Sequence, residues 1–179
     1  MDNWVVTFVK TGSEAKVIKI LEPKLDKELF MLFLPTKVEP LKAKGIWRET
    51  IKLLFPGYIF ARAKIKPDLI ASVLNPILDG MKSSHSVIRL LHYGDDKKSV
   101  AMRERERKFL EQLLDSNHCI VGSKGFIADN KIHITEGALM GLEDKIKKID
   151  RHQRKAILNV EFAGELCEMR LPLEITDKK

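Results

Sequence analysis

The chain has 179 residues, a formal net charge of +7 and hydrophobic residues at 44% of its positions. This length allows one or two domains with modest cores, and the hydrophobic content lies well above the disordered range. No apolar run approaches the roughly 18 residues that a membrane span requires, and Met1-Asp2-Asn3-Trp4 lacks the basic and apolar regions of a signal peptide. We therefore expect a cytoplasmic globular protein with no membrane contact, and the positive charge favours a polyanionic partner.

Catalytic patterns are missing from the sequence. Cys119 and Cys167 are too few for a disulfide framework and too far apart for a metal knuckle, so we expect reduced thiols. The histidines form no pair at metal-ligand spacing, and no serine lies in a Gly-x-Ser-x-Gly elbow. Cys119 follows His118, but adjacent side chains point apart on most backbones. We therefore expect no catalytic residue, no metal and no cofactor.

The start of the chain predicts a strand followed by a helix. Trp4 to Val9 is rich in β-branched and aromatic residues, which favours a strand. Thr11 and Glu14 have the spacing of a capping box, and the apolar positions that follow predict a helix from about Ser13. Pro23 removes a backbone donor, so the helix should kink or end there.

A charged arm and two further helices follow. Phe30 to Leu34 predicts a short buried strand. The charged stretch Thr36–Thr50, with a reversal at Lys44-Gly45, predicts a β-arm, for which a solvated hairpin is the simpler interpretation. A helix should begin at Pro67 and stop at Asn75-Pro76, because proline disfavours the helical conformation of the residue before it. A second helix should span about Ser99 to Ser116.

Within that second helix, Arg103 to Lys108 carries balanced charges and predicts a solvated face. From Ser116 to Asn130 the periodicity is lost, which predicts a linker, with Phe126-Ile127 as a segment able to pair with the next domain. The chain from Lys131 predicts closely spaced strands typical of a small barrel, at Ile132–Ile134, Lys145–Ile149, Ala156–Phe162, Cys167–Leu171 and Leu173–Thr176. The expected fold class is α+β, with domains at 1–115 and 131–179 joined by a linker at 116–130.

The stretch Leu54-Phe55-Pro56-Gly57-Tyr58-Ile59-Phe60-Ala61 combines a rigid bend with a strand. Proline fixes φ and glycine takes φ > 0, so Pro56-Gly57 makes the bend. Beyond it, Tyr58 and Phe60 share one face, and Ile59 and Ala61 share the other. One face should pack on helices, and the aromatic face is either a docking patch or further core.

Seven basic residues surround one turn near the end of the chain: Lys145, Lys147, Lys148, Arg151, His152, Arg154 and Lys155. Their positive field suits phosphate groups, and arginine also stacks on exposed bases. We favour contact with nucleic acid here over the alternative, a solvated lysine-rich hairpin.

Trp4–Phe8, Leu54–Phe60 and Thr135–Glu143, in this order and spacing, resemble motifs of the NusG family of transcription elongation factors. The resemblance covers nearly the whole chain. It implies an amino-terminal NGN domain, an antiparallel sheet flanked by helices, followed by a small KOW β-barrel in which Gly137 takes a tight turn. By the same resemblance, Phe8, Phe55 and Phe60 would dock on the clamp helices of RNA polymerase, Trp4 would pack in the core, and the 36–50 arm can lie near upstream DNA.

The sequence departs from the family pattern at Phe162-Ala163-Gly164-Glu165. General members carry phenylalanine followed by Gly-Arg here, and contact Rho or a small-subunit ribosomal protein. In this chain the aromatic is displaced to the preceding residue and glutamate replaces the arginine. Together with the basic Asp150–Arg154 turn, this departure resembles a specialised antitermination paralogue of the LoaP or RfaH type.

The resemblance therefore implies a monomeric elongation and antitermination factor. It would bridge the clamp and lobe of RNA polymerase and suppress pausing or termination, while the KOW domain contacts an RNA hairpin or another partner. One alternative is a general NusG that links polymerase to Rho or the ribosome. Another is a KOW-type ribosomal or RNA-maturation protein, which would need only the barrel.

Overall fold

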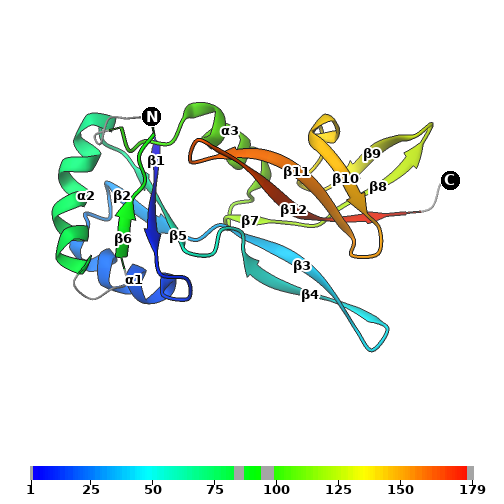
Figure 1. Cartoon of the computed structure of the whole chain (residues 1–179), viewed down its shortest axis with the longest axis horizontal. Helices are drawn as coiled ribbons and strands as arrows, with labels where there is room; N and C mark the ends of the chain where they lie inside the picture. The colour runs from blue at the N-terminus through cyan, green and yellow to red at the C-terminus, as the bar shows by residue number, and fades with distance from the viewer. Residues whose placement is uncertain (1, 83–86, 94–98, 177–179) are drawn as a thin grey trace. The chain divides into compact units, whose positions relative to one another are not determined.

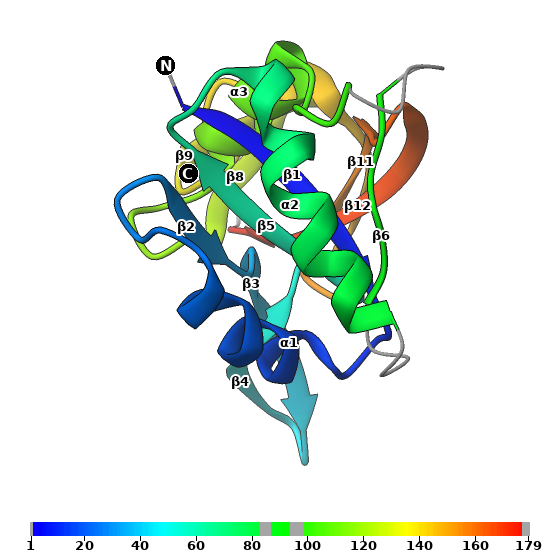
Figure 2. The same ribbon diagram turned by 90° about the vertical axis from the view of Figure 1, so that its left-hand side faces the viewer.

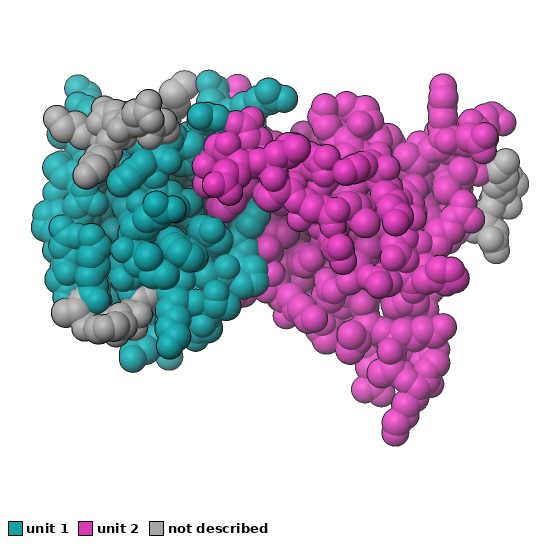
Figure 3. Space-filling model, in the orientation of Figure 1, with its two compact units in different colours: residues 1–34, 55–107 teal, residues 35–54, 108–179 magenta. Residues whose placement is uncertain are grey.

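The computed structural model describes residues 2–82, 87–93 and 99–176, and these form two compact units. Unit 1 comprises residues 1–34 and 55–107, and unit 2 comprises residues 35–54 and 108–179 (Figure 3). Unit 1 mixes helices with an antiparallel sheet, and unit 2 is mostly strands (Figure 1). The predicted α+β fold class is confirmed.

Unit 1 is built on a four-stranded sheet in the order β2-β5-β1-β6, with every neighbouring pair antiparallel. Its strands are β1 (Asn3–Val9), β2 (Phe30–Phe33), β5 (Tyr58–Ala63) and β6 (Val87–Leu90). Its helices are α1 (Glu14–Leu21), the short 3-10 turn η1 (Glu22–Lys24) and α2 (Pro67–Lys82), and α3 (Glu104–Leu113) begins in it. The strands predicted at Trp4 and Phe30 are confirmed, as is the end of α1 before Pro23.

One face of this sheet packs against α1 and α2, and Figure 2 shows α2 lying across the strands. Ile59, Ala61 and Ala63 of β5 belong to this core, as the alternation predicted. The opposite face carries the aromatic residues, and there Trp4 is 2% exposed and Phe60 is 0% exposed. At these two positions the aromatic face is core as well.

The prediction that Asn75-Pro76 stops the second helix is wrong, because α2 continues through Pro76 to Lys82. An internal proline removes one backbone hydrogen bond and costs about 3 kcal/mol. Leu74, Leu78 and Met81 lie on the buried stripe of the same helix. Each such side chain contributes roughly 1.5–3 kcal/mol on burial, so their packing outweighs the cost of the proline.

The capping box predicted at Thr11 and Glu14 does not form. The N-cap of α1 is Ser13, and no side chain makes a capping hydrogen bond. Glu14 is instead buried, at 3% exposure, and its carboxylate accepts a hydrogen bond from the Gly57 backbone N–H at 2.6 Å. A long-range partner has replaced the local one.

The helix predicted from Ser99 begins only at Glu104. Before it, Val100 and Met102 are buried, and the Met102 N–H donates to the Trp4 carbonyl at 2.6 Å, so this segment is fixed by β1 rather than by helical bonds. Within the charged run 103–108, Glu106 is only 3% exposed. The prediction of a solvated face is therefore wrong at Glu106.

Unit 2 contains two sheets. The hairpin of β3 (Thr36–Ala43) and β4 (Ile46–Leu53) turns at Lys44 and Gly45, both with positive φ, as predicted. The short strand β7 (Cys119–Ile120) pairs parallel with β3. The second sheet has the order β10-β11-β12-β8-β9, and we call it the half-barrel. Its strands are β8 (Ser123–Ala128), β9 (Lys131–Glu136), β10 (Ile146–Asp150), β11 (Lys155–Phe162) and β12 (Glu165–Ile175); a 3-10 turn, η2 (Glu143–Lys145), precedes β10.

The stretch 116–130, predicted as a linker, contains β8, which pairs with both β9 and β12. The half-barrel therefore begins at Ser123 rather than Lys131, because the aperiodic sequence is ordered by pairing with distant strands. The last two predicted strands are one strand, β12. It leaves its ladder with β11 at Pro172, which has no N–H to donate, and pairs with β8 from Leu173.

Gly137 has φ 96°, and a Cβ there would collide with the backbone of Gly122 and Ser123. The tight turn expected at this glycine is therefore observed. No helix among the described residues has the length and apolar character needed to cross a membrane.

Candidate functional site

The basic turn lies between β10 and β11. The Asp150 carboxylate accepts the Gln153 backbone N–H at 2.9 Å, and the Arg154 N–H approaches the Arg151 carbonyl at 3.4 Å. Arg154 closes the turn with φ 53°, in the left-handed region that favours glycine or asparagine. The turn is therefore held by hydrogen bonds among its own residues, chiefly the one to the Asp150 side chain, with Arg151 and His152 exposed at its tip.

Two lysines of β10 are exposed next to each other. Strand register shifts between Ile146 and Lys148, because Ile146 faces Leu158 while Lys148 faces Ile157. The extra residue, Lys147, forms a bulge, so the usual alternation of faces is broken and both lysines reach solvent. Lys145 is also exposed and pairs with Asp144 at 2.8 Å.

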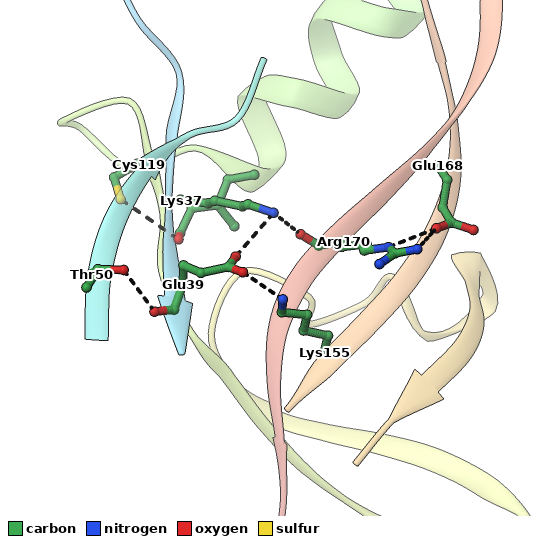
Figure 4. Close-up of polar contacts among 8 residues, drawn as sticks. Lys37, Glu39, Thr50, Cys119, Lys155, Glu168 and Arg170 are labelled. Carbon is green, nitrogen blue, oxygen red and sulfur yellow. Dashed lines mark hydrogen bonds and ion pairs between the residues drawn. The ribbon is translucent and has the colours of Figure 1, made fainter. Parts of the chain in front are cut away.

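Lys155 differs from the other predicted cations because its ammonium contacts the β3–β4 hairpin. Lys155 Nζ lies 2.6 Å from Glu39 Oε1, and Lys37 Nζ lies 3.4 Å from Glu39 Oε2 (Figure 4). Lys37 also donates to the Arg170 carbonyl of β12 at 2.6 Å. These side chains are 12–16% exposed, so this ionic cluster joins the hairpin to the half-barrel, and the Lys155 ammonium is already paired within it.

Burial and charge act against each other in this ionic cluster. Burial lowers the pKa of the Lys37 ammonium, and Glu39 only partly opposes that effect. Burial by itself would raise the pKa of Glu39, but the hydrogen bond from Lys155 and the charge of Lys37 outweigh it, so the pKa of Glu39 lies below its ordinary value. Glu39 is therefore the ionised centre between two ammonium groups.

Arg154 also contacts the hairpin. Its guanidinium lies 4.4 Å from the centroid of the Trp47 ring on β4, and it pairs with Glu174 at 2.9 Å. The Lys42 ammonium lies 5.7 Å from the same ring. The hairpin thus adds an aromatic ring and another cation to the basic turn.

Sequence reasoning did not include Lys42 or Trp47 in the site. The available signal was a lone tryptophan in an otherwise charged arm. Trp47 lies beside Arg154 because β3 packs against β12, and no local sequence pattern encodes that contact. Of the seven predicted basic residues, Lys145, Lys147, Lys148, Arg151 and His152 are exposed around the turn, and Arg154 and Lys155 bind the hairpin.

The three predicted docking aromatics occupy two stacks in unit 1. Phe8 stacks on Tyr58 with ring centroids 5.0 Å apart, and Phe55 stacks on Phe60 at 5.7 Å. Phe8 and Phe55 are half-buried, whereas Phe60 has no exposed surface and also contacts the Trp4 ring. Phe60 is therefore placed to support Phe55 rather than to contact a partner directly.

The segment Phe162–Glu165, where the sequence departs from the family pattern, forms the turn between β11 and β12. Phe162 is 8% exposed and faces the core, and Leu166 after the turn is 75% exposed. The two turn residues, Ala163 and Gly164, both have positive φ, at 56° and 80°. The only aromatic of this segment is thus internal.

Residues 2–111 match a protein-family model described as "Transcription termination factor nusG". Among solved structures, one titled "Domain interaction in Thermotoga maritima NusG" is 19% identical, with a TM-score of 0.49; the match covers 96% of this chain and 94% of that one. No curated protein matches in sequence. The family assignment rests on the family model, which spans more than half of the chain.

Proposed function

The chain belongs to the NusG family, whose members bind RNA polymerase, and we propose that it is a non-catalytic elongation factor of the antitermination type. It would act in the cytoplasm as a monomer and dock on the clamp helices through unit 1. By binding only the closed clamp, it would shift polymerase away from the paused state in proportion to its differential affinity.

The observation that carries the polymerase contact is the pair of aromatic stacks on the matched segment. Phe8 and Phe55 present half-buried rings, and each ring is stacked on a second aromatic ring, that of Tyr58 and of Phe60 respectively. Rings fixed in this way lose little conformational entropy on binding, and aromatic anchors supply much of the energy of an interface. We assign direct contact to Phe8 and Phe55, with Phe60 as their support.

The second half of the proposal is that the half-barrel is a KOW domain that contacts an RNA hairpin. It is supported by the five exposed basic residues around the β10–β11 turn. Between Asp144 and Lys155 the acids are Asp150, which binds the turn's own backbone, and Asp144, which pairs with Lys145; Glu174 of β12 also lies at the turn and pairs with Arg154. Weak contacts to polymerase and to RNA on one chain reinforce each other, because the second contact becomes effectively intramolecular.

The alternative of a general NusG that links polymerase to Rho or the ribosome is less favoured. Phe162 is buried, and the Ala163-Gly164-Glu165 segment offers neither the exposed aromatic nor the arginine expected for those partners. The family match also lies in residues 2–111, a segment that a barrel-only ribosomal or RNA-maturation protein would not need.

The proposal is tested by a pull-down with core RNA polymerase together with transcription in vitro through a pause and a terminator. We expect the chain to bind polymerase and to raise readthrough. Binding with increased termination, or with dependence on Rho, would favour the general NusG alternative. Absence of polymerase binding by the folded protein would refute the proposal.

A further inference from the structure

The hairpin and the basic turn line an open pocket of about 340 Å³. This volume lies at the small end of the range for ligand sites. The residues that give it chemical character come from three places in unit 2: Lys42 and Trp47 from the hairpin, Arg151, His152 and Arg154 from the turn, and Glu174 from the end of β12. The pocket thus depends on both sheets of the unit.

The lining combines a flat ring with positive charge. The Arg154 guanidinium lies over the Trp47 ring at 4.4 Å, and Glu174 holds that guanidinium at 2.9 Å. Lys42, Arg151 and His152 add further donors, while Glu174 is the one carboxylate in the lining and is already paired. A bare phosphate would need only the cations, whereas a flat ring beside cations suits a base with its attached phosphate.

The backbone of Arg154 adds a second, independent observation. A non-glycine residue with φ 53° costs roughly 1–2 kcal/mol relative to a relaxed conformation. Asparagine or glycine would fit this position better. The backbone thus holds Arg154 in a less favourable conformation, while an aromatic ring and a carboxylate order its side chain.

We propose that this pocket binds one unstacked RNA nucleotide from a bulge or loop of the bound RNA hairpin, an inference that rests on the proposed RNA contact. The base would stack on the Trp47–Arg154 pair, and Lys42 and Arg151 would contact its flanking phosphates. Glu174 supplies an acceptor that a ribose 2′-hydroxyl can donate to and that deoxyribose cannot, which favours RNA over DNA.

The test uses the full chain and four probes of one sequence: an RNA hairpin with a single-nucleotide bulge, the same hairpin without the bulge, and the DNA versions of both. Stacking on an aromatic side chain predicts that the bulged RNA binds about 5-fold or more tightly than the unbulged one. It should also quench the fluorescence of Trp47. The bulged DNA should bind more weakly than the bulged RNA.

Trp47→Leu should remove the preference for the bulge, and Trp47→Phe should keep it because the ring is retained. Arg154→Gly is a second variant, and glycine adopts φ 53° without strain. A loss of the preference for the bulged RNA in this variant would therefore not result from backbone strain. Preference retained in both Trp47→Leu and Arg154→Gly would overturn the pocket.

Equal binding of the bulged and unbulged RNA by the wild type would overturn the pocket and leave the proposed RNA contact standing. Equal or tighter binding of the bulged DNA would overturn the assignment to RNA. If no probe binds at low salt, both the pocket and the RNA contact of the proposed function fail.

Discussion

The Glu14 carboxylate accepts a hydrogen bond from the Gly57 backbone N–H at 2.6 Å, and so ties the start of α1 to the bend before β5. The bend is already specified by Pro56 and by the φ of 88° at Gly57. The carboxylate fixes its position beside Phe8, one of the proposed docking residues. We therefore expect the order of the proposed docking surface to depend on a buried acid in another element.

Gly57→Ala should destabilise unit 1. The residue has positive φ, and a Cβ would lie 3.1 Å from Thr11 Oγ1 and 3.3 Å from Phe8 Cε2. We expect the free energy of unfolding to fall by more than about 1 kcal/mol in urea denaturation. Gly80→Ala is the matched control, because a Cβ in that helical position meets nothing within 4 Å, and it should stabilise by about 0.5–1 kcal/mol. Equal effects of the two substitutions would contradict this account.

Phe55→Ala and Phe8→Ala should each weaken polymerase binding by roughly 1–3 kcal/mol while the circular dichroism stays native. Phe60→Ala should instead lower the free energy of unfolding by about 3–5 kcal/mol, since its side chain is fully buried. Leu69→Ala on α2 is the control, an exposed apolar residue outside the aromatic stacks. Unchanged polymerase affinity in folded Phe55→Ala and Phe8→Ala would remove these two residues from the interface.

Ala163→Asn should stabilise unit 2 by about 0.5–1 kcal/mol. Ala163 and Gly164 both have positive φ in a two-residue hairpin loop, a geometry that favours Asn-Gly. Thermal or urea unfolding measures the change. A neutral or destabilising result would show that the alanine side chain has a packing role that outweighs its backbone strain.

Lys147→Gln or Lys148→Gln should reduce the salt dependence of RNA binding. Each exposed lysine that neutralises a phosphate adds about 0.7–0.9 to the slope of log affinity against log salt. The slope should therefore fall by about one contact, with sequence preference unchanged. Lys16→Gln on α1 makes the same charge change in unit 1 and should leave the slope as it is. If the slope of log affinity against log salt is unchanged in both Lys147→Gln and Lys148→Gln, the RNA does not contact β10.

Acid should weaken the contact between the hairpin and the half-barrel through Glu39. Because the pKa of Glu39 is lowered in the folded state, ionised Glu39 stabilises the fold above its ordinary pKa of 4.5, and that contribution is lost as pH falls below it. Urea denaturation at pH 7 and at progressively lower pH measures the loss of stability.

Glu39→Gln should flatten that pH dependence, and Glu39→Ala should cost about 1–3 kcal/mol at pH 7, because it leaves two partly buried ammonium groups without their carboxylate. Glu49→Ala, at an exposed position of the same hairpin, is the control. A pH profile of Glu39→Gln that equals the wild type would assign the acid sensitivity to other carboxylates.

The elements with strong local signals could be predicted from the amino-acid sequence. Alternation placed Ile59 and Ala61 on the helix-packed face of β5, and the Lys44-Gly45 pair predicted the reversal of the hairpin. These features follow from backbone sterics and side-chain period, which act within a few residues. The resemblance to the NusG family rests on the same kind of local motif, and the match of residues 2–111 to the family model shows the family.

Features that depend on partners distant in the sequence became apparent in the folded chain. Glu14 binds the Gly57 backbone N–H instead of forming the predicted capping box. Helix α2 continues through Pro76 because its buried stripe packs on the sheet. Ser123–Ala128 forms a strand because it pairs with β12. The cluster of basic residues was visible in the sequence, but its division into five exposed residues and two that contact the hairpin was not. Arg154 contacts Trp47, and Lys155 binds Glu39, each more than one hundred positions earlier in the chain. Such contacts depend on how distant strands pack together, and no local sequence pattern specifies them.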